Sequence, residues 1–350
     1  MILKDKNNII INGTSIGNSQ KCYVIAEIGI NHNGQLDIAK KLIDVAVEAG
    51  ANAVKFQKRN LDELYRKDAL DDPNIESQGF EILVQVLKEV EFNKKEYEEI
   101  LKYCNEKGIT FLCTPWDKKS VDFLEQFNVP AYKVASADMT NFPLIKYIAN
   151  TEKPIIISTG MSTMDEIEKT VNFLKKENSS FILLHCNSTY PAPTEHLNLE
   201  LIPTIKERFS VPVGYSGHEQ GIIPTLTAAN IGACVIERHI TLDKKMEGID
   251  QAVSLNPDEF IQLVKYIRES EMAKGISQKK ITRGEVLQRE VLSKSLVCKK
   301  DISEGEIFSE DNIEVKGPAK GISPQHYFEI LGNKSHRNLK KGDYIQSDDL

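Results

Sequence analysis

Short runs of apolar and β-branched residues alternate with longer stretches of helical periodicity along the first 270 or so residues. Eight of the runs have the length and composition of buried strands, namely 23–29, 52–57, 109–114, 131–136, 154–159, 181–186, 211–216 and 233–239. Amphipathic helical stretches separate them, such as the one that follows a capping box from Thr163 to Glu166.

This rhythm predicts the fold class. Strand and helix alternating eight times over roughly 250 residues is typical of a (β/α)₈ barrel, whereas an open doubly wound sheet seldom needs so many repeats. We therefore predict an α/β protein whose first domain, residues 1–272, is a TIM barrel. Its closing helix is expected to have Asn256 as N-cap and Pro257 in its first turn.

The pattern changes after that helix. Residues 273–290 are polar and lack a sustained apolar period, which indicates a linker. Over residues 291–350, glycine and proline divide short apolar runs, and we expect a small compact second domain there.

Composition narrows the possible partners. With 350 residues and 41% hydrophobic content the chain can bury a full core. A net charge of -7 gives no general attraction to nucleic acid or to an anionic membrane, so an anionic substrate needs a local cluster of lysine or arginine. No apolar window is long enough to span a bilayer, and we expect a cytoplasmic protein. The six cysteines form no CxxC pair, and buried free thiols are expected.

Polar side chains lie at the end of every predicted strand. Catalytic groups of TIM barrels gather at these carboxyl ends. The residues are Glu27, Lys55, Gln57, Thr114, Lys133, Ser136, Asp138, Ser158, Ser188, Tyr190, Ser216, His218, Glu237 and His239. Polar chemistry at all eight ends predicts one shared polar pocket.

Strand parity indicates which of these groups face the pocket. Glu237 and His239 share one face of the last strand, and Arg238 points the other way. Lys133 and Ser136 differ in parity, so they share a site only if the chain turns between them.

Two pairs of residues allow two interpretations each. His218 and His239 on neighbouring strands could hold one divalent metal ion, or they could be hydrogen-bonded polar histidines. Lys55 and Lys133 lie inside apolar strands and could bind an anion, or their ammonium groups could reach past the strand ends to solvent.

Several motifs occur in order along nearly the whole chain: "AEIGINHNG", "VKFQ", "YKVASADMTN", "ISTGM", "YPAP", "GYSGH", "ERHIT", "SLVCKKDISEGE" and "NIEVKGPAKGISP". Together they resemble the sialic acid synthase family, bacterial enzymes that make nonulosonic acids. The resemblance implies a (β/α)₈ barrel followed by an antifreeze-like (SAF) domain. It also implies a domain-swapped homodimer in which that small domain covers the partner's active site.

The resemblance further implies the reaction and the site. Phosphoenolpyruvate would condense with an open-chain N-acylated amino sugar, N-acetylmannosamine or a 2,4-diacetamido-6-deoxy hexose, releasing phosphate, with Mn²⁺ or Mg²⁺ as cofactor. The implied phosphoenolpyruvate contacts are Lys55, Thr114, Lys133, Ser136, Ser158, Ser188 and Ser216. The implied sugar contacts are Gln57, Tyr190 and Asp250, and the implied metal ligands are His218 and His239.

The implied chemistry agrees with these residue types. Two lysines and several hydroxyl groups suit a phosphate and a carboxylate in an acidic protein. A metal ion would polarise the aldehyde as a Lewis acid. Glu27 or Asp138 would act as acid or base toward water, and the sequence does not choose between the two carboxylates. With Lys55 and Lys133, which would bind phosphoenolpyruvate, they make up the expected catalytic residues. Both could instead be structural partners of the lysines.

Two other functions fit the fold. A metal-dependent sugar isomerase or hydrolase could use the same barrel, although it would not need two lysines for a dianionic substrate. The protein could also be a non-catalytic carbohydrate-binding protein in which the second domain provides recognition.

One departure from the family pattern concerns the sugar. Family members often read "KRPG" where this chain reads "KGPA", and their arginine reaches across the dimer to the N-acyl group, whereas Gly317 has no side chain to do so. Gln251 stands where histidine is common, and Asp138 where many bacterial members have glutamate. These differences predict that N-acetylmannosamine is a poor substrate and that a modified sugar, such as a 2,4-diacetamido-6-deoxy hexose, is preferred.

Overall fold

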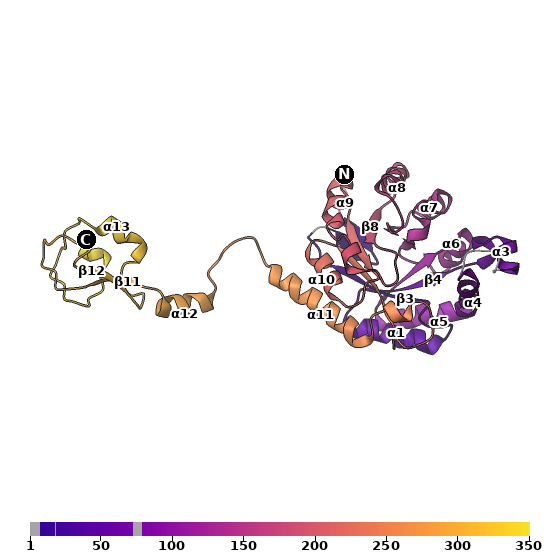
Figure 1. The fold of residues 1–350 in the computed structure, drawn as a ribbon, viewed down its shortest axis with the longest axis horizontal. Coiled ribbons are helices and arrows are strands. Elements are labelled where there is room, and N and C mark those ends of the chain that lie inside the picture. Colours follow the sequence, from indigo (N-terminus) through magenta and orange to yellow (C-terminus); the bar gives the residue numbers. More distant parts are fainter. Residues whose placement is uncertain (1–7, 18, 73–78) are drawn as a thin grey trace. The chain divides into compact units, whose positions relative to one another are not determined.

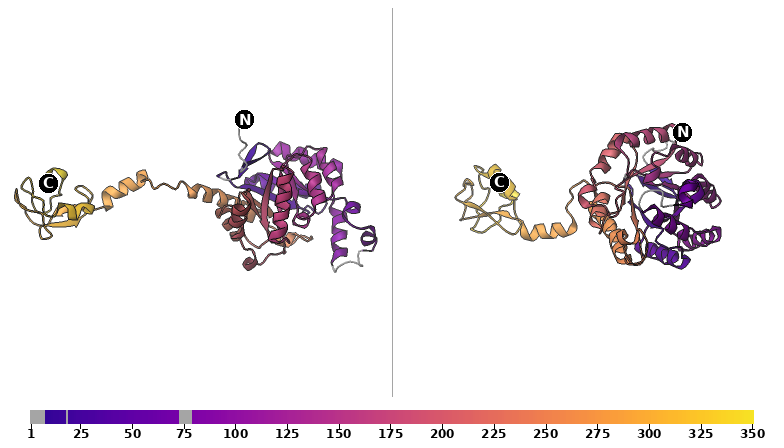
Figure 2. Two further views of the ribbon diagram at one scale, coloured as in Figure 1. Left: turned by 90° about the horizontal axis from the view of Figure 1, so that it is seen from above. Right: turned by 45° about the vertical axis from the view of Figure 1, so that its right-hand side comes forward.

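The computed structural model describes residues 8–17, 19–72 and 79–350, and the chain divides into two compact units, Met1–Gly275 and Ile276–Leu350. In the first unit eight parallel strands form a closed barrel in the order β10-β3-β4-β5-β6-β7-β8-β9. Helices surround the strands as a ring (Figures 1 and 2). The predicted α/β class and TIM barrel are therefore confirmed.

The barrel strands agree closely with the apolar runs of the sequence. They are β3 (Tyr23–Gly29), β4 (Ala53–Lys58), β5 (Thr110–Pro115), β6 (Tyr132–Val134), β7 (Ile155–Ser158), β8 (Phe181–Cys186), β9 (Val213–Gly217) and β10 (Val235–His239). Only β6 is much shorter than its predicted run, because the chain turns into a 3₁₀ helix, η2 (Ser136–Asp138).

One main helix follows each barrel strand. These helices are α1 (Leu36–Ala49), α5 (Lys94–Lys107), α6 (Lys118–Glu125), α7 (Phe142–Ala149), α8 (Met164–Lys176), α9 (Leu201–Phe209), α10 (Ile223–Asn230) and α11 (Pro257–Lys274). Three more helices precede α5: α2 (Leu61–Leu64), α3 (Lys67–Asp71) and α4 (Phe80–Val90). The predicted capping box at Thr163 and the Asn256 cap of the closing helix are both present.

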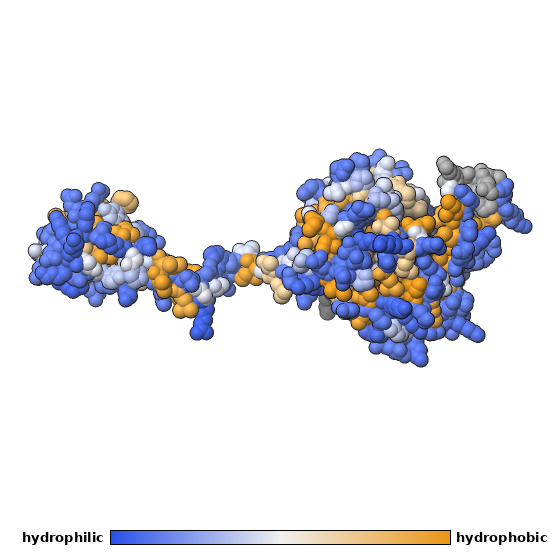
Figure 3. All heavy atoms as spheres, turned by 60° about the horizontal axis from the view of Figure 1, so that its bottom comes forward, coloured by the Kyte–Doolittle hydropathy of each residue, from blue (hydrophilic) through white to orange (hydrophobic). Residues whose placement is uncertain are grey.

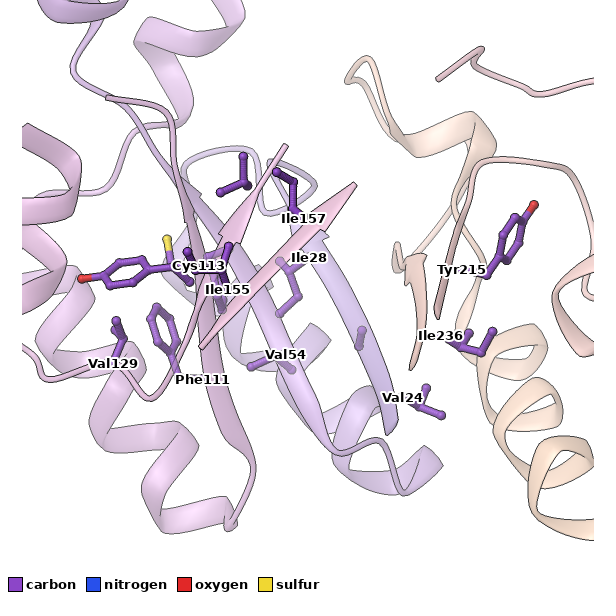
Figure 4. Close-up of a cluster of buried hydrophobic side chains, with 14 of the residues drawn as sticks. Val24, Ile28, Val54, Phe111, Cys113, Val129, Ile155, Ile157, Tyr215 and Ile236 are labelled. Atoms are coloured by element: carbon purple, nitrogen blue, oxygen red, sulfur yellow. The ribbon is translucent and has the colours of Figure 1, made fainter. Parts of the chain in front are cut away.

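The barrel unit has two apolar cores. The larger lies between the strands and the surrounding helices and includes Val54, Phe111, Ile157 and Ile236 (Figure 4). The smaller fills the barrel interior, and an amino-terminal hairpin of β1 (Asn8–Ile11) and β2 (Thr14–Gly17) adds three isoleucines to it. No hairpin was expected there. Its isoleucines share this core with Tyr23, Ala53 and Val235, the first residues of β3, β4 and β10.

The second unit has its own small core. It contains α12 (Arg283–Leu292), the antiparallel pair β11 (Ser295–Cys298) and β12 (Ile313–Lys316), and α13 (Tyr327–Ile330). Helix α12 begins within the stretch 273–290 that was expected to be a linker. Because none of its residues is buried, the helix needs no apolar face, and the available signal was its capping box, Thr282 with Glu285.

Two features expected from the sequence concern the helices and the cysteines. Among the residues that the structure describes, no helix is long and apolar enough to span a membrane. All six cysteines are buried and free, as predicted.

The hairpin contact gives a testable prediction. Replacing Ile11, which is fully buried in the barrel-interior core, with alanine should lower the free energy of unfolding by about 2–5 kcal/mol, because a cavity replaces apolar contacts. Ile10→Ala is the matched control, since Ile10 is 65% exposed and its loss should cost about 0.5 kcal/mol or less. Urea denaturation measures both, and equal effects would show that the hairpin does not pack on the barrel.

Candidate active site

A polar cavity of about 260 Å³ lies at the carboxyl ends of the barrel strands, and all eight strands or the segments directly after them contribute to its wall. Most of the predicted site residues line it: Glu27, Lys55, Gln57, Thr114, Lys133, Ser136, Ser158, Ser188, Tyr190, Ser216, His218 and His239. The structure therefore brings these twelve side chains to one place, as the shared-pocket prediction requires.

Four buried charged groups form the floor of this cavity. Lys55 Nζ lies 2.7 Å from Glu27 Oε2 and 3.8 Å from Glu237 Oε2, and Lys133 Nζ lies 4.0 Å from Glu237 Oε1. Each of the four residues is at most 4% exposed. The ammonium groups therefore do not reach past the strand ends to solvent, and that interpretation of Lys55 and Lys133 is wrong.

Burial and neighbouring charges shift the pKa values of these four groups in different directions. Burial raises the pKa of Glu27 above its ordinary value, against the opposing effect of Lys55. Burial acts in the same direction on Glu237, but the two lysines outweigh it and its pKa is lowered. Burial lowers the pKa of Lys133, whereas for Lys55 the two carboxylates outweigh burial and raise the pKa. Glu27 is thus the carboxyl group of this cluster best able to hold a proton.

Hydroxyl groups complete the surroundings of the lysines. Lys55 Nζ donates to Thr114 Oγ1 over 3.1 Å, and Lys133 Nζ donates to Ser158 Oγ over 2.7 Å. Two further hydroxyls, of Ser136 and Ser188, approach the backbone of Gly160 so closely that a Cβ there would lie 2.7 and 2.1 Å from them. A cavity wall with two ammonium groups and several hydroxyl donors is suited to a small anion.

The turn after β6 settles the parity question. Because the strand ends at Val134 and η2 begins at Ser136, Ser136 lines the same cavity as Lys133. Asp138, at the end of η2, does not line it. Asp138 Oδ1 accepts a hydrogen bond from Asn141 Nδ2 over 2.8 Å, while Oδ2 is buried without a partner and burial raises the pKa of the carboxyl group.

Two imidazoles stand at the opposite wall, with their ring centroids 5.4 Å apart. His218 Nδ1 donates to the carbonyl oxygen of Asn187 over 2.9 Å, and Nε2 lies 2.8 Å from the Tyr190 hydroxyl; in the neutral ring Nε2 carries the lone pair. His239 Nδ1 is buried without a hydrogen-bond partner, 3.7 Å from Asp250 Oδ2. Asp250 itself does not line the cavity.

Behind these imidazoles lies a buried ion pair. Arg238 Nη1 donates to Glu219 Oε1 over 2.9 Å and to Thr225 Oγ1 over 2.6 Å, and Tyr215 donates its hydroxyl to Glu219 Oε2 over 2.8 Å. Arg238 is 1% exposed and Glu219 fully buried. Arg238 therefore points away from the cavity, as parity predicted, and the pair joins the residue after His218 to the residue before His239.

Some residues differ from the sequence-based assignment. Gln251, where the chain departs from the family pattern, is 1% exposed, and its amide nitrogen donates to the carbonyl oxygen of Asn31 over 3.1 Å. Trp116 and Cys186 line the cavity and were missed. Trp116 follows β5 directly, so its position at a strand end was a usable signal, whereas the sequence around Cys186 is that of an apolar strand.

The barrel, its anion-suited cavity and the second unit define a class of (β/α)₈-barrel enzymes with an appended SAF domain. The NeuB family matches residues 42–279, and the SAF domain matches residues 293–350. The chain belongs to the NeuB family.

Individual relatives agree with this assignment. The N,N'-diacetyllegionaminic acid synthase of Campylobacter jejuni is 41% identical over 337 residues, which cover 93% of this chain and 99% of the relative. The human N-acetylneuraminate-9-phosphate synthase is 38% identical, covering 96% and 94%. The crystal structure of an N-acetylneuraminic acid synthetase from Leptospira borgpetersenii superposes with a TM-score of 0.71 at 34% identity, covering 80% of this chain and 94% of that one.

The buried ion pair gives a second prediction. Arg238→Met should lower the free energy of unfolding by about 3–5 kcal/mol, because it leaves the carboxylate of Glu219 buried and uncompensated. Arg208→Met is the control, since the Arg208–Glu168 pair is about half exposed and worth about 1 kcal/mol or less. Chemical denaturation compares them, and the double variant Arg238→Met/Glu219→Leu should recover much of the loss. If Arg238→Met costs no more than the control, the pair is not a structural tie.

Proposed function

We propose that this protein condenses phosphoenolpyruvate with an open-chain N-acylated amino sugar to form a nonulosonic acid and phosphate. The observation that carries the proposal is one cavity that holds two buried ammonium groups, a set of hydroxyl donors and two neighbouring imidazoles. The names of the relatives support it, because they are synthases of acids of this kind.

The cationic half of the cavity suits phosphoenolpyruvate. This substrate carries a phosphate and a carboxylate, which two ammonium groups can bind. Lys55 and Lys133 supply them, one near each carboxylate oxygen of Glu237. The hydroxyls next to the lysines supply directed donors for the remaining oxygens. A sugar isomerase or hydrolase has no use for this cradle, and a non-catalytic binder has no use for the buried charges, so the condensation is favoured over both.

The imidazole half suits a divalent metal ion. The Nδ1–H of His218 is held by a backbone carbonyl, an arrangement common among metal-binding histidines, and the neutral ring would present the lone pair of Nε2 to a metal ion. Nδ1 of His239 has no hydrogen-bond partner and could be the second nitrogen that binds the metal ion. Burial lowers the pKa of this imidazole to about 4, which keeps the ring neutral. These two residues would hold Mn²⁺ or Mg²⁺, which when bound polarises the aldehyde oxygen of the sugar.

Carboxyl groups of the protein would transfer the protons of the reaction. Carbon 3 of the enol phosphate attacks the aldehyde carbon, whose oxygen takes a proton, and water adds to carbon 2 before phosphate leaves. Glu27 suits the transfer of the water's proton, because burial raises its pKa and because Lys55 and the amide of Gln57, 2.9 Å away, fix its orientation. Asp138 is less suited, since it does not line the cavity.

The oligomeric state is part of the proposal. Helix α12 exposes apolar side chains, with Leu287 56% and Val291 68% exposed, and apolar surface is visible along this segment in Figure 3. A second copy of the chain would bury this surface in a homodimer whose SAF domains are exchanged between partners. The six free cysteines favour the cytoplasm as its compartment, because that compartment keeps thiols reduced.

The acceptor sugar is also proposed. Gly317 offers no guanidinium to an N-acyl group, so we expect a 2,4-diacetamido-6-deoxy hexose to be preferred over N-acetylmannosamine.

A direct assay tests the reaction. The protein incubated with phosphoenolpyruvate, an acylated amino sugar and Mn²⁺ should release phosphate and form a 2-keto acid in equal amounts, and EDTA should abolish turnover until Mn²⁺ is restored. His239→Ala should reduce kcat at least a hundredfold while leaving the fold intact. Phosphate release without sugar, or no product with either sugar, would refute the condensation. Near-normal activity of His239→Ala in excess chelator would refute the metal site.

Sedimentation tests the dimer. The full chain should have twice its monomer mass, and Leu287→Glu/Val291→Glu should shift it toward monomer, because charged groups would replace the apolar contact. Gln288→Glu, a charge introduced on the same helix at a position that is already polar, is the control. A monomeric parent protein would refute the proposed assembly.

A further inference from the structure

A second cavity, of about 660 Å³, lies at the amino-terminal end of the barrel. Cys22 and Cys234 in its wall directly precede the first residues of β3 and β10, so it is at the opposite end of the strands from the candidate active site. None of the described residues that line it also lines the polar cavity of that site. Its volume falls within the range of small-molecule sites, about 300–1,000 Å³. This cavity is therefore large enough to hold a ligand of its own.

Two ammonium groups lie at one turn in the wall of this cavity. Lys274 Nζ, at the end of α11, donates to the carbonyl oxygen of Ala229 over 3.2 Å. Lys206 Nζ, from α9, lies 4.0 Å from the position that a Cβ on Gly232 would take, and the N–H of Gly232 bonds the same carbonyl of Ala229 over 3.4 Å. A carbonyl oxygen satisfies a donor of Lys274 but does not cancel its charge. The turn at residues 229–232 therefore holds two uncompensated cations.

No carboxylate in the described wall is free to neutralise these cations. The acidic residue there, Glu271, accepts from Arg268 Nη1 over 3.1 Å and from the backbone N–H of Cys22 over 2.5 Å. Within the described chain the two lysines make no ion pair, and nor does Lys21 in the same wall. A ligand with more than one negative charge would supply the missing partner.

Another part of the wall is apolar. Ala233, Cys234 and Ile267 line the cavity and are buried, whereas the side chain of Met272 beside them is 75% exposed. A flat aromatic ring can pack on such a surface, and a methionine thioether makes favourable contacts with aromatic rings. The cavity thus offers a place for a ring as well as for charge.

Two side-chain amides complete the wall. Gln20 and Asn230 are exposed, line the cavity and make no side-chain hydrogen bond to the described part of the protein. Each amide offers both a donor and an acceptor, and the edge of a nucleobase presents the complementary pattern.

These three features together select the kind of ligand. Inorganic phosphate would use the cations but leave the apolar wall in water. A fatty acid would cover that wall but has no use for the amides, and a sugar phosphate brings hydroxyl groups where an aromatic ring fits. A nucleotide uses all three, because it combines phosphates, a flat ring and polar ring edges.

We propose that the cavity at the amino-terminal end of the barrel binds a nucleoside di- or triphosphate. Its phosphates would lie at Lys206 and Lys274, and its base would pack on the apolar wall beside Met272. This site goes beyond the proposed function, because it lies at the other end of the strands and does not depend on the reaction there.

Isothermal titration calorimetry of the full-length protein tests the site. At least one of the four ribonucleoside triphosphates, titrated separately in EDTA, should bind with one molecule per chain. Lys206→Gln/Lys274→Gln should weaken this binding at least about tenfold, because two charges are lost while both side chains keep a donor. Lys176→Gln, at an exposed lysine on α8 that does not line the cavity, is the control and should bind as the parent protein does. Unchanged affinity of the double variant, or no binding of any of the four nucleotides, would overturn the site.

Inorganic pyrophosphate separates the role of the base from that of the charge. It should bind at least about tenfold more weakly than the nucleotide, because it has no ring to cover the apolar wall. Met272→Gln should weaken nucleotide binding several-fold and leave pyrophosphate binding unchanged. Pyrophosphate that binds as tightly as the nucleotide would overturn the assignment to a nucleotide.

Thermal unfolding gives a second readout. The nucleotide should raise the melting temperature of the parent protein and of Lys176→Gln, but not that of Lys206→Gln/Lys274→Gln. An equal rise for all three proteins would overturn the site. Because neither measurement uses turnover, a protein that forms no product would refute the condensation without affecting this result.

Discussion

The parallel pairing of β3 with β10 is the contact on which the rest of this structure depends, because it closes the barrel. It joins segments more than 200 residues apart and sets Glu27 beside His239 and Ile25 beside Glu237. Without this closure the polar ends of the first and last strands would lie at two open edges of a sheet. With it, a carboxyl group from the start of the barrel and an imidazole from its end face one cavity.

Closure also determines the energetics of the site. Lys55, Lys133, Glu27 and Glu237 are buried together, and each is tolerable in the barrel only because the others are present. Such a cluster is a poor source of stability, since desolvation offsets much of its Coulomb attraction. Its ammonium groups are already oriented and dry, so an anion such as the proposed substrate would bind with little reorganisation.

On the face of the strands that points away from the cavity, a buried ion pair supports the packing. Arg238 and Glu219 make their ion pair behind the imidazoles, where their neighbours are Thr225 and Tyr215. The alternation of side chains along β10 places Glu237 and His239 at the cavity and Arg238 in the ion pair on the other face. The same alternation explains how one short run of residues contributes both to a cavity and to the packing behind it.

Much of this could be read from the sequence, because it depends on local patterns. Runs such as 23–29 and 181–186 became strands at the predicted bounds, and period-2 alternation placed Arg238 correctly. The amino-terminal hairpin and α12 escaped prediction, since the hairpin is too short to show a period and α12 buries no face. Motifs and strand ends also located most of the cavity residues.

Only the tertiary structure decided which of those residues line the cavity and which contacts they make. Position in the sequence could not show that Asp138 turns out of the cavity while Ser136 stays in it, because one turn after Val134 separates them. Nor could it show that Gln251 is held by the backbone, or that the Arg59 guanidinium lies over the Trp116 ring. Alternation and composition depend on residues that are neighbours in the sequence, so the sequence alone reveals them. Proton affinity and hydrogen-bond satisfaction depend on every group within a few ångströms, and only the folded chain brings those groups together.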